Sequence, residues 1–571
     1  MRKRKGLLVL IGAMVLLLGL SIPMMQCAPS GEEITPPEEE VTPPEEEITP
    51  PEEGEIKYGG RLNVGWSAGD CMETLKCGST WTYESMGCMF WQLIYDQLWI
   101  IGPPPDYEPL PMLATSWESE DGKTWIFHLQ EDAVFHDGVP VTAEDVAFTM
   151  EYLPYADPTW LYPSCDYEPG SIKVIDDYTV QCTLKVPLGG CYADAAPFDW
   201  MPMLPKHIWE PYKDDMLSFP NDEAIGSGPF KLKEFKPAQY IWFVANEDYW
   251  GERPYVDEVV WKTYGSDDAY YMAMTKGEVD MYGYGGISGL MVDEMEENEN
   301  IKTFVSPGIG VEWLTFNLHK DGPLQDLNVR KAIMHGIDRD RIIDMAYLGY
   351  ADKTDSFIYP ELPEHNPNLP QYNYDPDLAN KILDDAGYVD TDGDGIRNDP
   401  EGGNLSFELV VPSDWTEEVK ASSLIKEQLK DVGIEIIIRA MDTATFFNFI
   451  YCPNEDTYDI GFNEEEPGPY ADWMWEFCRS WKIGSWNTAY YMNPEFDEIL
   501  EKCVSERDPT KYREYLYEMQ MMIAEDLPYG FLDRLSIINA VRTDKFEGWV
   551  ETMGGISTWI NPWTYYKVHL K

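Results

Sequence analysis

The sequence predicts a mixed α/β fold with more than one lobe. Segments with strand-like and helix-like patterns alternate through residues 57–571, and such alternation is typical of α/β proteins. The chain has 571 residues, of which 44% are hydrophobic and 14% aromatic. It is therefore long and apolar enough to bury the cores of several domains.

Local signals place individual elements along the chain. Residues 124–129 are aromatic and β-branched, which predicts a strand. Thr142 and Asp145 form a capping-box pattern that predicts the start of a helix. A second helix is expected within 375–387, because aspartate stands at its N-cap, proline at its first position and glycine after its end. Residues 434–439 predict another strand.

The first 27 residues have the pattern of an export signal. Four basic residues, 2–5, precede an apolar run at 6–20, which is too short to cross a membrane comfortably. Cys27 follows at the distance at which bacterial or archaeal lipoproteins carry their lipid-attachment cysteine. We therefore expect residues 1–27 to be a lipoprotein-type signal peptide, with acylation at Cys27. An uncleaved anchor and ordinary secretion remain as alternatives.

Residues 28–56 predict an extended, disordered tether. A seven-residue repeat of threonine, paired prolines and glutamates runs through this segment. Paired prolines exclude a helix and favour the stiff polyproline II conformation. The 11 glutamates of the segment repel one another and keep it solvated.

The net charge of −60 excludes several classes of partner. Phosphates would be repelled and no basic stripe is present, so we expect no nucleic-acid binding. Docking of the folded body on anionic lipid is disfavoured for the same reason. Membrane contact is then expected only through the N-terminal lipid anchor.

Several separate motifs together identify the chain as a member of a known family. They stand at 114–150, 226–230, 276–280, 329–339, 375–388 and 458–461. In residue type and order they resemble the family 5 extracellular solute-binding proteins. These are the oligopeptide-, dipeptide- and nickel-binding receptors of ABC importers. The resemblance covers nearly all of residues 57–571.

This resemblance implies a two-lobe periplasmic-binding-protein (Venus-flytrap) fold with an extra subdomain in lobe I. We expect lobe I at 57–305, its extra subdomain near 80–200, lobe II at 306–534, and a return to lobe I at 535–571. The expected protein is an extracytoplasmic monomer, in the periplasm or on the outer cell surface. It captures ligand between its lobes and delivers it to an ABC permease with ATPase subunits, without acting as an enzyme.

An acidic segment after the expected strand at 458 is the first candidate ligand contact. It resembles the family region in which peptide receptors present a carboxylate to the α-ammonium group of the ligand. Glu464, Glu465, Glu466 and Asp472 compete for that role, and Trp473 adjoins them. A carboxylate in a closed cleft would bind an ammonium through charge-assisted hydrogen bonds. The alternative is a loop of solvated glutamates.

Five further residues are candidate ligand contacts, because the matching positions in the family face the cleft. They are Trp66, Tyr95, Trp99, Trp313 and Asn317. The alternative for each aromatic residue is an ordinary place in the core, where most large aromatic side chains lie.

Residues 390–401 fit a calcium-loop pattern. Asp390, Asp392, Asp394 and Glu401 occupy positions one, three, five and twelve, with Gly395 at position six. Ca²⁺ prefers such oxygen ligands. A strand is expected after the loop, so the flanks differ from those of an EF-hand. The alternative is an acidic turn without an ion. No other cofactor is expected.

The ligand class stays open at this point. Peptide is our first expectation, oligosaccharide the second and chelated metal the third. A rival class is a secreted glycoside hydrolase that works through paired carboxylates. The usual motifs of serine hydrolases, zinc proteases and nucleotide-binding loops are absent from the sequence.

Overall fold

The computed structural model describes most of the chain beyond the predicted tether. The described residues are 56–66, 91–103, 109–153, 167–188, 201–283, 286–400, 402–451, 458–466, 477–483, 486–558 and 561–571. The predicted signal peptide and tether lie outside this set, apart from residue 56. Within the described residues, no helix is both long and apolar enough to cross a membrane.

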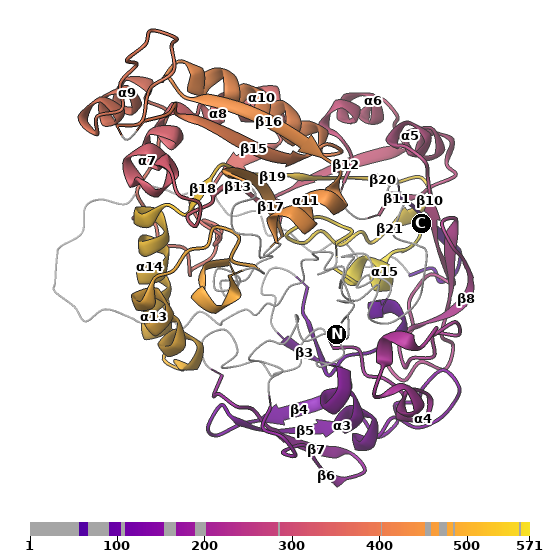
Figure 1. The fold of residues 1–571 in the computed structure, drawn as a ribbon. Coiled ribbons are helices and arrows are strands. Elements are labelled where there is room, and N and C mark those ends of the chain that lie inside the picture. The colour runs from indigo at the N-terminus through magenta and orange to yellow at the C-terminus, as the bar shows by residue number, and fades with distance from the viewer. Residues whose placement is uncertain are drawn as a thin grey trace, which may run out of the picture.

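A seven-stranded mixed sheet forms one large part of the molecule (Figure 1). Its central strand, β1, pairs in parallel with a neighbour on each side, and the outer pairs are antiparallel. In spatial order the strands are β12 (Ile301–Ser306), β20 (Ile537–Arg542), β11 (Met281–Tyr282), β1 (Arg61–Trp66), β10 (Glu258–Thr263), β9 (Tyr240–Ala245) and β8 (Phe230–Lys236).

Helices α5 (Asp267–Lys276) and α6 (Val292–Glu296) pack on this sheet beside β1 and β12. Tyr270 and Met274 of α5 and Met295 of α6 are buried in one hydrophobic core with Ala540 of β20. The core therefore ties helices from the middle of the sequence to a strand near its end.

A five-stranded sheet forms the second large part. Its strands are β16 (Glu435–Met441), β15 (Ser406–Pro412), β17 (Ile460–Glu465), β13 (Val311–Phe316) and β18 (Tyr529–Phe531). Strand β15 runs parallel to β16 and β17, while β13 pairs antiparallel with β17 and β18. The helices of this part are α7 (Leu327–Gly336), α8 (Arg339–Met345), α9 (Pro376–Asp385), α10 (Thr416–Lys430) and α11 (Thr443–Ile450).

The chain passes between the two sheets twice. Residues 307–310 lead from β12 to β13, and we call them the first crossing. Residues 532–536 lead from β18 to β20, and we call them the second crossing. The second crossing contains β19 (Asp533–Leu535), which pairs with β14 (Ala351–Lys353). Two such connections would let the two parts rotate against each other.

A separate four-stranded antiparallel sheet lies at the end of the molecule away from the five-stranded sheet (Figure 1). Its order is β4 (Ala114–Glu118), β5 (Thr124–Leu129), β7 (Thr179–Thr183) and β6 (Lys173–Asp176). Helix α3 (Ala143–Tyr152) packs against it and begins at the predicted capping box. Strand β2 (Trp99–Ile101) pairs with β3 (Pro109–Pro111), and α4 (Lys206–Trp209) follows along the chain.

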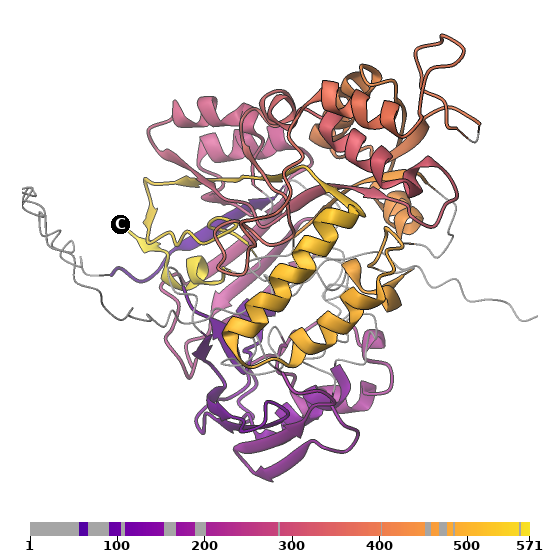
Figure 2. The same cartoon turned by 90° about the vertical axis from the view of Figure 1, so that its left-hand side faces the viewer.

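The long helices α13 (Pro494–Ser505) and α14 (Pro509–Asp526) lie side by side (Figure 2). Each begins with proline after a capping Asn or Asp side chain, as expected for sharp helix starts. The chain ends with β21 (Phe546–Glu547), α15 (Trp563–Lys567) and β22 (His569–Leu570). The short 3₁₀ helices are η5 (Glu210–Tyr212), η6 (Met216–Ser218), η7 (Gly289–Met291), η8 (Pro323–Gln325) and η10 (Ser480–Lys482).

Candidate ligand-binding site

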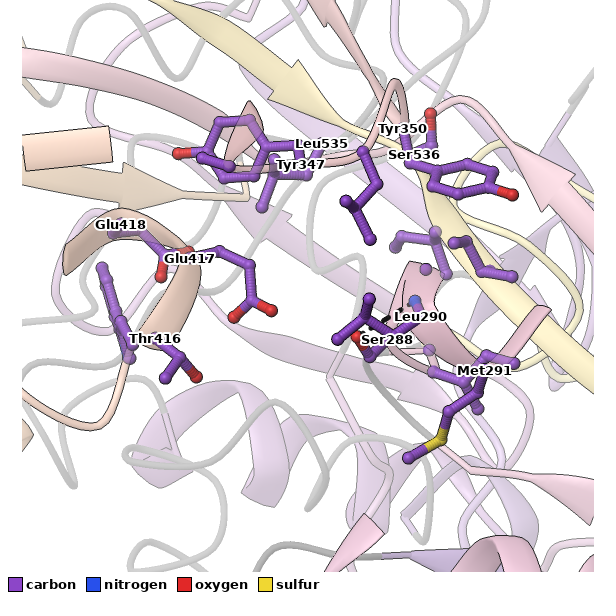
Figure 3. Close-up of a pocket in the computed structure, with 18 of the residues that line it drawn as sticks. Ser288, Leu290, Met291, Tyr347, Tyr350, Thr416, Glu417, Glu418, Leu535 and Ser536 are labelled. Atoms are coloured by element: carbon purple, nitrogen blue, oxygen red, sulfur yellow. Dashed lines mark hydrogen bonds between the residues drawn. The ribbon is translucent and has the colours of Figure 1, made fainter. Parts of the chain in front are cut away.

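A cavity of about 800 Å³ opens between the two large sheets. One wall comes from the seven-stranded part, namely residues 286–291 and the start of α5. The opposite wall comes from the end of α8, the start of α10 and the end of β17. Both crossings contribute, through Gly310 and residues 535–536. We call this cavity the inter-sheet pocket. Figure 3 shows Glu417 and Glu418 facing Ser288 and Leu290 across it.

The residues that line the inter-sheet pocket are predominantly acidic. Six carboxylates line it, against a single basic side chain, Lys420. The Lys420 ammonium lies 3.9 Å from Glu417 Oε1. This excess of negative charge would attract a positively charged ligand and repel an anionic one. The six are Asp268, Asp414, Glu417, Glu418, Glu464 and Glu466.

Two of these carboxylates stand at the end of β17: Glu464 lies within the strand, and Glu466 follows its last residue. Glu464 and Glu466 line the pocket, because alternate residues of a strand point to the same face. Burial, with Glu466 and Glu465 close by, raises the pKa of Glu464 well above its usual value. Gly310 leaves room for the Glu464 side chain, because a Cβ atom at residue 310 would lie 2.2 Å from Glu464 Oε1.

Glu465 points to the opposite face of β17 and does not line the pocket. Its Oε1 accepts a hydrogen bond from the Tyr451 hydroxyl. Burial raises its pKa to about 8, although that hydrogen bond acts in the other direction. Thus the structure separates the three glutamates that the sequence treats as equivalent. Asp472 and Trp473 lie outside the described residues.

One of the six, Glu418, meets two buried carboxyl groups, Glu312 and Asp533, at the wall of the pocket. Glu418 comes from the first turn of α10, Glu312 from β13 and Asp533 from β19. Glu312 lies within hydrogen-bonding reach of both of the others. We call these three groups the carboxyl triad. Tyr347 supplies an additional donor, because its hydroxyl donates to Glu312 Oε2 over 2.5 Å.

Burial dominates the electrostatics of the carboxyl triad. It raises the pKa of Glu418 to about 7 and that of Asp533 to about 7. The pKa of Glu312 is raised well above its usual value by burial and by the charges of Asp533 and Glu418. Protons are therefore shared within the triad near neutral pH.

The sequence did not single out Glu312, Glu418, Asp533 or Tyr347. One signal was present, because Glu312 is an acidic residue inside an otherwise apolar stretch at 311–316. All six side chains of that strand are buried. An ionisable residue there indicates a functional site more often than one on an exposed strand.

The other predicted ligand contacts lie in hydrophobic cores. Trp66, Tyr95, Trp99 and Trp313 are at most 4% exposed and do not line the inter-sheet pocket. Trp313 packs edge-on against Phe357, with ring centres 4.9 Å apart, and donates to Thr315 Oγ1 over 2.9 Å. Its ligand role, like that of the other three aromatic residues, stays a prediction.

Asn317 holds a turn at the end of β13. Its Nδ2 donates to the Tyr458 carbonyl oxygen over 3.0 Å, and its Oδ1 accepts from the backbone N–H of His319. The first of these contacts joins the end of β13 to Tyr458, two residues before β17. Asn317 is not among the residues that line the inter-sheet pocket, so its ligand role also stays a prediction.

The predicted calcium ligands lie together on the surface. Oxygen atoms of Asp390, Asp392 and Asp394 lie within 4.8 Å of one another. Gly395 has a φ of +89°, which a residue with a side chain rarely adopts. In the part of the chain that the structure describes, no other group of three potential ligands is so close. Glu401 falls outside that part, and calcium binding stays a prediction.

Comparisons with known proteins agree with this architecture. The family model described as "Bacterial extracellular solute-binding proteins, family 5 Middle" matches residues 108–482. The oligopeptide-binding protein AppA of Bacillus subtilis is 29% identical over 427 residues, which is 73% of this chain and 76% of AppA. The nickel-binding periplasmic protein of Escherichia coli is 28% identical over 353 residues, 60% of this chain and 65% of that protein.

Solved structures share the fold. The structure of AppA in complex with a nonapeptide has a TM-score of 0.74 at 24% identity, covering 90% of this chain and 100% of that one. The mannohexaose-bound oligopeptide-binding protein of Thermotoga maritima has a TM-score of 0.74 at 22% identity, covering 90% and 98%. The mixed α/β fold is therefore that of periplasmic binding proteins. With a family match over more than half of its length, the chain belongs to the bacterial extracellular solute-binding proteins of family 5.

Proposed function

We propose that this protein is the membrane-tethered substrate-binding subunit of an ABC importer and that it captures peptides or similar small solutes in the inter-sheet pocket. The observation that carries the proposal is the lining of that pocket, which comes from both sheets and both crossings. Rotation about the crossings would close the pocket on a ligand. A permease with its ATPase subunits would then receive the ligand, and no covalent bond would change.

The size and charge of the pocket support a peptide. A volume of about 800 Å³ is within the range for small-molecule sites. The acidic wall suits the α-ammonium group of a peptide, and Glu464 and Glu466 are the proposed contacts. Peptides are also what the printed name of AppA says that relative binds. Membership of a solute-binding family supports a protein that is not an enzyme.

The N-terminal sequence supports the tethered location. We propose that Cys27 carries the lipid and that residues 28–56 hold the folded body away from the membrane, outside the cytoplasm. The protein would act there as a monomer. We also propose a structural Ca²⁺ at Asp390, Asp392 and Asp394 with Glu401, supported by the spacing of these residues and by the closeness of the three aspartates.

Native mass spectrometry of the gently purified protein tests the ligand class directly. A co-purified peptide is the expected result. A co-purified oligosaccharide or metal chelate would keep the receptor function and change its ligand. Turnover of a chromogenic glycoside would contradict the receptor function and favour a hydrolase.

Variants locate the peptide contact. Glu464→Gln with Glu466→Gln should weaken peptide binding about tenfold or more, since charge-assisted hydrogen bonds are lost. Glu465→Gln is the matched control, because this neighbour points to the opposite face of the strand and does not line the pocket. Equal losses in both variants would argue against the proposed contact.

A further inference from the structure

The carboxyl triad stands where the pocket meets both crossings. Glu312 is the second residue after the first crossing, and Asp533 belongs to the second. The second crossing contacts β13, the strand that follows the first crossing, because the backbone N–H of Leu532 donates to the Glu312 carbonyl oxygen over 2.9 Å. Glu418 reaches the pocket surface, whereas Glu312 and Asp533 are fully buried.

Three oxygen atoms of the triad have no donor of their own. Among the described residues, no N–H or O–H group donates to Glu312 Oε1, Asp533 Oδ1 or Asp533 Oδ2. A proton shared between Glu312 and Asp533 can satisfy one oxygen atom of each. Buried acceptors without donors are costly, so they indicate a missing partner.

The nearby basic residues do not fill this role. Arg339 Nη1 donates to the Thr354 carbonyl oxygen over 2.8 Å and to Asp355 Oδ1 over 2.9 Å. Its charge lowers the pKa of Asp533 only in part, because burial has the larger effect. Arg534 binds Glu361 through two hydrogen bonds of 2.9 and 2.6 Å.

The remaining charged groups around the triad are acidic or already paired. Glu417 and Glu464 stand on the same wall of the pocket, and Lys420 lies beside Glu417. The Tyr347 hydroxyl is a neutral donor that reaches Glu312. A cation in the pocket is therefore lined by more carboxyl groups than positive charges, and these carboxyl groups stand on both α10 and β17.

The geometry favours an organic cation over a metal ion. Ligand oxygens in a metal site lie close together, and among the described residues only the aspartates of the 390–394 loop meet that condition. An ammonium group carries three N–H donors and tolerates wider spacing of its acceptors. It would also relieve the repulsion between carboxylates, as a neutral ligand would not.

On the basis of the proposed function, we propose that the carboxyl triad forms a subsite for an aliphatic primary ammonium group, such as the end of a lysine side chain. This site is distinct from the α-ammonium contact proposed at Glu464 and Glu466. Glu418 contacts the ammonium group at the pocket surface. The buried carboxyl groups of Glu312 and Asp533 lie behind Glu418 and stabilise the bound cation. Binding of the cation displaces shared protons to solvent, so the substrates of this receptor are basic peptides or amines.

The test compares two peptides of equal shape. Isothermal titration calorimetry on the whole protein measures Ala-Lys-Ala against Ala-norleucine-Ala, which lacks only the ammonium. We expect Ala-Lys-Ala to bind about tenfold or more tightly, with proton release that is detected by repeating the titration in a second buffer. Cadaverine, titrated alone, distinguishes a free amine from a peptide as the source of the ammonium.

Variants assign the preference to the triad. Glu418→Gln and, separately, Asp533→Asn should reduce the preference for lysine to about twofold or less, while Glu465→Gln should keep it. If a variant fails to fold, the comparison of the two peptides on the unmodified protein still decides. Equal affinities for the two peptides there would overturn the inference and leave the proposed function intact. Failure of every peptide and of cadaverine to bind would overturn both the inference and the proposed function. Displacement of Ala-Lys-Ala by Ni²⁺ would overturn the inference, because it would mean that the subsite binds a metal ion and not an ammonium group.

Discussion

The hydroxyl of Tyr347 donates to Glu312 Oε2 over 2.5 Å, and this contact joins the end of α8 to the first strand after the first crossing. Tyr347→Phe removes that donor and leaves a second oxygen of Glu312 unsatisfied. We expect a loss of about 1–2 kcal/mol in the free energy of unfolding, measured by chemical denaturation. Tyr350→Phe, at another tyrosine that lines the pocket, should cost clearly less. Equal losses would mean that the contact contributes nothing specific.

The raised pKa values of the carboxyl triad predict a pH-dependent stability. Glu418 and Asp533 titrate at about 7 in the folded protein and near 4 when unfolded, so the folded state binds more protons between these values. Their contribution is fully present below about pH 4 and is lost as the pH rises through about 7.

Unfolding free energies of the unliganded protein at several pH values between about 4 and 8 would show this effect. The double variant Glu418→Gln, Asp533→Asn should lose less stability over that range than the unmodified protein. An exposed carboxylate, Glu514, provides the control variant Glu514→Gln. If the double variant and the unmodified protein follow parallel curves, the triad does not hold protons near neutral pH.

Local sequence signals predicted many of the elements. The capping box at Thr142 and Asp145 is present, and Asp375 accepts from the backbone N–H of Leu378 at the start of α9. The strand predicted at 434–439 is found one residue later and is slightly longer, Glu435–Met441. These features depend on residues within a few positions of one another, so their physical causes are visible in the sequence.

The site was harder to predict for a physical reason. Glu312, Glu418 and Asp533 are far apart in the chain and meet only because β13, α10 and the second crossing come together in the fold. A pattern of neighbours cannot show that contact. Likewise, Trp99 and Trp313 would look the same in the sequence whether they faced a ligand or a core. Strand alternation, by contrast, could have separated Glu465 from Glu464 and Glu466.

Acylation at Cys27 can be tested by location. Cys27→Ser should release the protein from the membrane fraction into the soluble exported fraction. The serine hydroxyl has no sulfur atom with which to form the thioether that carries the lipid. Immunoblotting of the fractions measures the change. A variant at the neighbouring Met25, Met25→Leu, should remain with the membrane. Retention of Cys27→Ser on the membrane would favour an uncleaved anchor.

Calcium binding at the 390–401 loop predicts a metal-dependent melting temperature. Adding Ca²⁺ should raise the melting temperature of the unmodified protein, and EGTA should reverse the rise. Asp390→Asn with Asp392→Asn should abolish the response, since two of the clustered ligands lose their charge. The exposed Asp377→Asn on α9 should keep it. No response in the unmodified protein would identify the loop as an acidic turn.

Asp280 connects the C-terminal segment to the central strand of the seven-stranded sheet. It is fully buried, and its Oδ2 accepts from the backbone N–H of Asn63 over 2.9 Å and from Asn63 Nδ2 over 2.8 Å. Its Oδ1 accepts from Lys545 Nζ over 3.0 Å.

Asp280→Ala should therefore cost about 3 kcal/mol in the free energy of unfolding, because three donors lose one acceptor group. Lys545→Met should cost about 1 kcal/mol or less, since the lysine is partly exposed and water can replace it. The two variants, compared by chemical denaturation, decide whether the backbone contacts or the ion pair hold this junction, and equal costs would favour the ion pair.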